Sequence, residues 1–134
     1  MLTKVTVLVA LILALVDPFT APAAGAAPVT VTVQRREQRS FVSRSLDYWR
    51  WRGHTINVRV EARQPRCSPT GADQIRVCRK RIPGAVIAFY DFDKRVAYVE
   101  WWKSWVICHE VGHGLGYLHS DPEIWRCPGT PRIS

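Results

Sequence analysis

The chain has 134 residues, with 19 basic and 11 acidic side chains and a formal charge of +8 at pH 7. That length suits a single domain. Hydrophobic residues make up 47% of the chain and charged residues 22%, which excludes an intrinsically disordered protein. Apart from Lys4, the basic residues are scattered between Arg35 and Arg132 without a long block, so charge alone identifies no partner.

Residues 1–26 have the pattern of a secretory signal peptide. Lys4 precedes an apolar run over residues 5–16, and the small residues at 24–26 follow as a cleavage pattern. The apolar run has about 12 residues, whereas a membrane-spanning helix needs about 20, so we expect no membrane anchor. The sequence therefore predicts a secreted, extracellular protein whose domain spans residues 27–134.

The expected domain contains four cysteines, Cys67, Cys78, Cys108 and Cys127. In an exported chain of this size, an even number of cysteines usually means disulfide bonds. Three pairings are open, and the sequence does not choose strictly among them. Pairing each cysteine with its nearest neighbour would join Cys67 to Cys78 and Cys108 to Cys127, and each bridge would contribute about 3 kcal/mol of stability.

The first half of the domain predicts a strand, a helix and two further strands. Alternating β-branched residues at 29–33 indicate the first strand. Residues 40–52 begin with a candidate cap at Ser40, so we expect a helix there. Period-two alternation at 55–60 indicates a second strand, and a proline-containing loop then returns through a short strand at 74–78.

The second half predicts an antiparallel strand pair and a final helix. Two apolar or alternating runs, 84–92 and 94–102, flank a turn that contains Asp91 and Asp93. The last helix should start near Ser104. This order of elements places the chain in the α+β class. The two aspartates leave a calcium site undecided, because a turn uses aspartate equally readily.

The residues with the clearest chemistry form the pattern HExxHxxGxxH. His109 and His113 are four residues apart on the expected helix, so both imidazoles project from one face and can bind one metal ion. Glu110 follows the first of them, where its carboxylate can take a proton from water activated by the metal. Gly116 permits a sharp turn that returns His119 to the same ion. Three imidazoles leave a fourth position open, which is typical of catalytic zinc.

This pattern resembles the metzincin clan of zinc endopeptidases, which includes the matrixins, the astacins and the small neutral proteases secreted by actinomycetes. The resemblance implies a minimal metzincin-like α+β domain: a mixed sheet with an antiparallel edge strand, one helix before it and the zinc-binding helix after it. It implies that His109, His113 and His119 bind zinc and that Glu110 is the general base. It also implies that a peptide substrate lies along the edge strand, within residues 84–92, by strand addition.

Two features depart from the clan. Metzincins follow the third histidine with a turn that holds a methionine beneath the metal, but residues 27–134 contain no methionine. Only 15 residues follow His119 in this sequence. A bond between Cys108 and Cys127 would hold this tail under the zinc-binding helix and could replace the missing turn.

The sequence thus predicts a secreted zinc-dependent endopeptidase with one catalytic zinc ion, protein or peptide substrates and a monomeric state, and without a nucleic acid partner. Two alternatives stay open: a relative that binds zinc but no longer cleaves peptides, and a basic module that binds anionic polymers. The residue that stabilises the oxyanion cannot be read, and Tyr90 and Tyr117 are named without commitment. His54, the histidine outside the pattern, is expected to be an ordinary surface residue.

Overall fold

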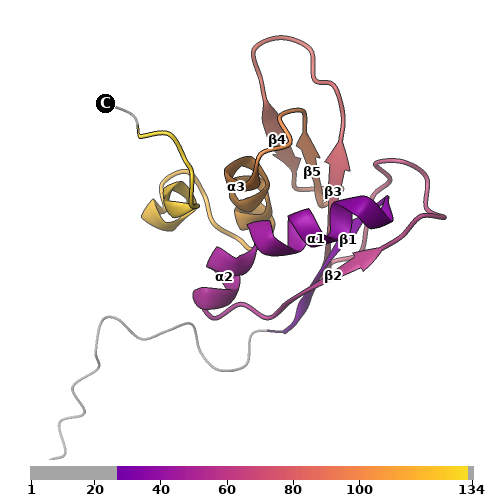
Figure 1. Ribbon diagram of the computed structural model, residues 1–134, viewed down its shortest axis with the longest axis horizontal. Coiled ribbons are helices and arrows are strands. Elements are labelled where there is room, and N and C mark those ends of the chain that lie inside the picture. Colours follow the sequence, from indigo (N-terminus) through magenta and orange to yellow (C-terminus); the bar gives the residue numbers. More distant parts are fainter. Residues whose placement is uncertain (1–26, 133–134) are drawn as a thin grey trace, which may run out of the picture.

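The computed structural model describes residues 27–132, so the expected signal peptide at residues 1–26 lies outside the described part of the chain. Its helices and strands, shown in Figure 1, are β1 (Val29–Val33), α1 (Arg36–Ser45), α2 (Asp47–Trp51), β2 (Ile56–Val60), β3 (Gln74–Arg79), β4 (Ala88–Asp91), β5 (Val96–Val99), α3 (Ser104–Gly114) and the 3-10 helix η1 (Pro122–Arg126). The α+β class predicted from the sequence is confirmed.

The strands form one mixed sheet in the order β2-β1-β3-β5-β4. β1 pairs in parallel with β2 on one side and with β3 on the other, and β3 pairs in parallel with β5. β4 runs antiparallel to β5, with Ala88 opposite Val99 and Asp91 opposite Val96. The predicted antiparallel pair is therefore present, and β4 lies at the edge of the sheet, although both strands are shorter than the runs that predicted them.

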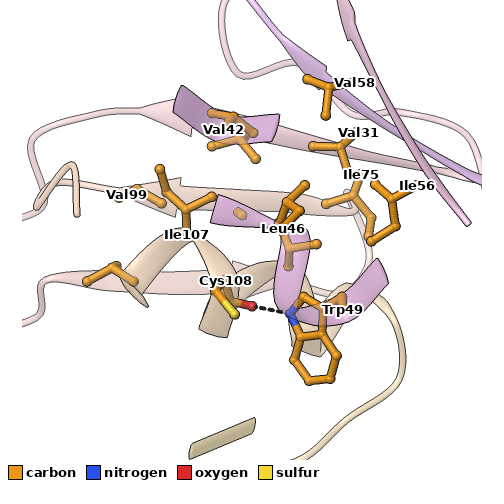
Figure 2. Packing of buried hydrophobic residues seen from close by; sticks show 14 of the residues in the cluster. Val31, Val42, Leu46, Trp49, Ile56, Val58, Ile75, Val99, Ile107 and Cys108 are labelled. Atoms are coloured by element: carbon orange, nitrogen blue, oxygen red, sulfur yellow. Dashed lines mark hydrogen bonds between the residues drawn. The ribbon is translucent and has the colours of Figure 1, made fainter. Parts of the chain in front are cut away.

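The helices pack on one face of the sheet, α1 across β1 and β2 and α3 across β3, β4 and β5 (Figure 1). Figure 2 shows the core between these two layers. Val31 and Ile75 from the strands meet Trp49 and Ile107 from the helices and Leu46 between α1 and α2, and none of the five has any exposed surface. The valine-rich strands suit this role, because β-branched side chains pack well on a pleated surface.

The helix predicted at residues 40–52 is wrong in its start and in its continuity. α1 begins four residues earlier, because the side-chain oxygen of Gln38 accepts a hydrogen bond of 3.1 Å from the Arg35 N–H and closes the first turn. The helix then breaks at Leu46, whose ψ of 3° lies outside the helical range, before α2 begins. Ser45 favours the break, since its hydroxyl donates a 2.8 Å hydrogen bond to a carbonyl one turn earlier.

The opposite face of the sheet carries a smaller apolar cluster. Its buried residues come from β3, from β5 and from the loop after β3: Cys78, Ile82, Val96 and Tyr98. Cys67, from the long loop between β2 and β3, packs against them. This loop therefore covers part of the sheet face that the helices leave open.

Two disulfide bonds fasten this fold. One joins Cys67 to Cys78 on β3, and the other joins Cys108 on α3 to Cys127 after η1. The predicted pairing of nearest neighbours is confirmed. Two disulfides favour an oxidising compartment outside the cytoplasm. No helix within residues 27–132 is long and apolar enough to cross a membrane.

Candidate metal centre

Three histidines converge at the carboxyl end of α3. His109 and His113 lie one turn apart on the helix and are buried, whereas His119 belongs to the loop that follows and is exposed. α3 ends at Gly114, and the chain then reverses at Gly116, whose φ of 102° is readily adopted only by glycine. The structure thus brings together the three residues that the sequence pattern selects as metal ligands.

Each of the three imidazoles directs its Nε2 atom toward the other two rings. Nε2 of His119 lies 3.0 Å from Nε2 of His109 and 3.1 Å from Nε2 of His113. Nitrogens bound to one tetrahedral zinc ion lie about 3.3 Å apart, given Zn–N bonds of about 2.0–2.1 Å. The observed separations fit this geometry, so the three histidines can hold a single metal ion. No other group of three or more metal-ligating side chains occurs within residues 27–132.

Contacts with the second ring nitrogen orient His113. Its Nδ1 lies 2.8 Å from the carbonyl oxygen of Tyr117, which can only accept, so Nδ1 carries the proton and donates it. This tautomer leaves the lone pair of Nε2 free to bind a metal. In contrast, Nδ1 of His109 is buried and has no hydrogen-bond partner among the described residues. Contacts with the rings of His113 and Trp125 and with the backbone of Ile124 therefore hold His109 in place.

Trp125, on η1, covers the histidines from the side of the tail. Its ring centroid lies 4.9 Å from that of His109 and 5.1 Å from that of His119, and its Nε1 donates a 2.9 Å hydrogen bond to the His119 carbonyl. The bond between Cys108 and Cys127 ties η1 to α3. The sequence predicted that this disulfide would hold the tail under α3, but it did not predict the contact of Trp125 with the histidines. The one signal for that contact was the position of Trp125, two residues before Cys127.

Burial keeps the two helical histidines in the form that binds metals. Desolvation, followed by the charges of the two neighbouring imidazoles, lowers the pKa of His109 to about 4, and the backbone of Ile124 acts in the opposite direction. Desolvation is also the main cause that lowers the pKa of His113. Because a metal binds the neutral imidazole, both rings are available as ligands at neutral pH.

Glu110 is buried beside these ligands on α3, with 7% of its surface exposed. Burial alone raises its pKa to about 7. A carboxyl group whose pKa lies near neutrality takes up and releases protons readily at physiological pH, which suits a general base. The structure therefore gives Glu110 a proton affinity that fits the role implied by the sequence resemblance.

Glycines let α3 approach the core closely enough to set the histidines. A Cβ atom at Gly112 would lie 2.5 Å from Cζ2 of Trp49, and one at Gly114 would lie 2.5 Å from Cδ1 of Ile75. Trp49 also donates a 2.7 Å hydrogen bond from Nε1 to the Cys108 carbonyl, drawn in Figure 2. Cys108, the residue before His109, is thus held in place by a hydrogen bond from a side chain of the core.

Two tyrosines and the fourth histidine lie near the site. The hydroxyl of Tyr117 is 2.9 Å from Nε2 of His54, and the Tyr117 ring stacks on Trp49 at 4.6 Å. The expectation that His54 is an ordinary surface residue is wrong, because the turn after α2 places it half-buried against the loop that follows α3. The hydroxyl of Tyr90, on β4, is buried and has no hydrogen-bond partner within residues 27–132.

The aspartate pair near β4 serves the turn. Oδ1 of Asp91 accepts a 3.0 Å hydrogen bond from the Lys94 N–H, and Oδ2 lies 3.9 Å from Nζ of Lys94. Asp93 is exposed in the same turn. These contacts account for Asp91 through local turn chemistry.

Comparisons with known proteins give no relative to reason from: no protein-family model, no curated protein and no solved structure matches the chain.

Proposed function

We propose that the protein is a secreted zinc-dependent endopeptidase of the metzincin type. The observation that carries the proposal is the convergence of Nε2 atoms from His109, His113 and His119, with the buried Glu110 adjacent to the first of them. Three imidazoles form a ligand set that zinc accepts, and they leave a position for substrate or water. The two disulfides and the signal-like residues 1–26 support export.

Catalysis in this proposal divides between the metal and Glu110. A zinc ion, when bound, supplies a Lewis acid for the scissile carbonyl and lowers the pKa of water. The carboxylate of Glu110 accepts a proton from the attacking water and then donates it to the nitrogen of the leaving amine. The hydrogen bond from His113 to the Tyr117 carbonyl holds the imidazole in its ligand tautomer throughout.

β4 is the candidate platform for an extended peptide. It pairs with β5 on one side, and no strand of the described residues pairs with its other side. An exposed strand edge offers backbone hydrogen bonds to an added peptide. Phe92 follows β4 directly and is exposed, with its ring 6.1 Å from that of His113. A peptide added to β4 would pass close to the histidines and beside an apolar side chain.

Trp125 takes, in this proposal, the place that methionine has in the metzincins. Its ring lies against His109 and His119, and its indole N–H holds the backbone of His119. The disulfide to Cys127 keeps this support attached to α3. The absence of methionine from the domain therefore does not leave the ligands without a supporting side chain.

The test combines zinc content with casein hydrolysis for the purified protein, with and without a chelator. We expect one zinc ion per chain and cleavage that the chelator stops and added zinc restores. Glu110→Gln should retain zinc and lose nearly all hydrolysis, because the amide cannot accept the proton. Asp73→Asn, which neutralises an exposed carboxylate outside the site, is the matched control and should cleave like the wild type.

Each other outcome has a definite meaning. Zinc without cleavage would contradict the peptidase assignment and favour the alternative of a zinc-binding relative that no longer cleaves peptides. Full hydrolysis by Glu110→Gln would contradict the role given to Glu110. A chain that binds no zinc would contradict the metal site itself.

A further inference from the structure

Two adjoining hollows lie where β1, β2 and β3 end, and none of the three histidines lines either of them. The first has a volume of about 370 Å³, lies between the ends of β1 and β3, and contains Arg35, Arg66, Arg76 and Arg79. The second is more open, lies along β2, and contains Arg35, Arg36, Arg39, Arg59 and Arg63. Residues 34, 35 and 37 line both hollows, so together they form one surface, which we call the arginine groove.

The arginine groove holds most of the excess charge of the chain. Eight arginines line it, against the two glutamates Glu37 and Glu61, which gives a net charge of +6 out of +8 for the whole sequence. These arginines are scattered along the sequence and meet only because β1 lies between β2 and β3 in the sheet. Open parallel sheets commonly bind ligands at the carboxyl ends of their strands, which is where this groove lies.

The charge of the groove is only partly used within the protein. Glu61 forms ion pairs with two arginines: its Oε1 lies 2.7 Å from Nη2 of Arg59, and its Oε2 lies 3.0 Å from Nη2 of Arg76. Arg76 is 4% exposed, and its Nε has no hydrogen-bond partner among the described residues, so a buried guanidinium beside the groove keeps unused donor capacity. The amino terminus of α1, at Arg36, adds the positive end of a helix dipole.

We propose that the arginine groove binds a linear polyanion whose charges are phosphate groups. Guanidinium groups suit phosphate because their N–H donors pair with two phosphate oxygens at once, and every basic side chain that lines the groove is an arginine. Arg66 and Arg79 line only the first hollow, and Arg59 and Arg63 line only the second. A row of linked phosphates can contact arginines in both hollows, whereas a single phosphate occupies one position within them. This binding uses no residue of the metal centre and does not depend on the proposed peptidase activity.

The test measures binding of end-labelled inorganic polyphosphate to the purified protein by fluorescence anisotropy. With about four phosphate contacts, the dissociation constant should rise about 100-fold between 50 and 200 mM salt. The triple variant Arg35→Ala/Arg63→Ala/Arg66→Ala should bind at least about tenfold more weakly, with a smaller dependence on salt.

A second triple variant serves as a control, because it removes the same number of positive charges from outside the arginine groove. Arg44→Ala/Arg81→Ala/Arg132→Ala removes the same charge from exposed arginines outside both hollows, and it should weaken binding by less than about threefold. Circular dichroism and zinc content should be equal in all three proteins, because the substituted side chains are exposed.

Four results would overturn the proposal. Equal weakening by the two triple variants would show that binding depends on diffuse charge. Competition by inorganic monophosphate as effective as that of the polymer, per phosphate, would indicate a site for a single anion. Polyglutamate binding as tightly as polyphosphate would refute the preference for phosphate. Binding to phosphatidylglycerol vesicles without binding to polyphosphate would assign the groove to a membrane surface.

Discussion

Replacing Glu110 with glutamine should stabilise the metal-free protein above neutral pH. Burial raises the pKa of Glu110 from 4.5 to about 7 in the folded state, whereas in the unfolded chain the carboxyl is solvated. Each pKa unit corresponds to about 1.4 kcal/mol, so ionised Glu110 destabilises the folded state by about 3 kcal/mol. Glutamine has nearly the same shape and carries no charge, so it avoids this destabilisation.

The protonation state of Glu110 in the folded and in the unfolded chain determines the sign of this stability difference and the pH range over which it develops. Below pH 4.5 the carboxyl is protonated in both the folded and the unfolded chain, so Glu110 causes no charge-related loss. Between pH 4.5 and about 7 the unfolded chain ionises first, and the stability of the wild type falls relative to Glu110→Gln. Above about pH 7 both states are ionised, and the difference stays at its full value.

The assay is urea unfolding of both proteins in the presence of a chelator, at a series of pH values from about 4 to 9, with free energies obtained by linear extrapolation. The two proteins share every other ionisable group, so the difference between the two curves isolates Glu110. Asp73→Asn should differ from the wild type by less than about 0.5 kcal/mol at every pH. A difference for Glu110→Gln that is constant with pH, or a wild type that is more stable at pH 8, would show that this carboxylate is not desolvated.

Three further variants test the supports of the metal centre. Trp125→Phe keeps an aromatic ring but removes the hydrogen bond to the third histidine, so it should weaken zinc binding about tenfold in a competitive chelator titration, whereas Trp101→Phe should leave it unchanged. Cys108→Ala/Cys127→Ala should lower the free energy of unfolding by about 3 kcal/mol. It should also weaken zinc binding, because the disulfide anchors η1 to α3. Zinc binding that stays as tight as in the wild type would contradict this role of the disulfide. Gly112→Ala should destabilise the fold by about 1–3 kcal/mol, seen as a lower Tm, because its Cβ would overlap the buried indole of Trp49.

The histidine cluster could be foreseen because its information is local. The spacing of His109 and His113 fixes their shared helix face, and a glycine three residues later fixes the reversal that brings back His119. The strands and the antiparallel pair were foreseen from apolar runs and alternation, which are also short-range signals, whereas the parallel pairing of the first three strands was not. These features depend on short stretches of sequence and were predicted correctly, although the first turn of α1, which Gln38 closes, was missed.

Most features that sequence reasoning missed depend on contacts between distant residues. The break at Leu46 allows Trp49 to reach α3, and Ser45 alone is too weak a local signal to predict that break. The position of Trp125 follows from a disulfide that spans 19 residues. The arginine groove is the clearest case, because its charges are scattered in sequence and gather only when three strands lie side by side.

α3 combines two roles that oppose each other, and this links metal binding to stability. One helix supplies Ile107 and Val111 to the core and also buries His109, Glu110 and His113. Desolvation of these polar groups weakens the metal-free fold at neutral pH, in contrast to the apolar residues around them. A metal that binds only the folded state offsets this loss, and it does so more strongly as its free concentration rises above the dissociation constant. The folded chain should therefore be most resistant to unfolding when the three histidines hold a metal ion.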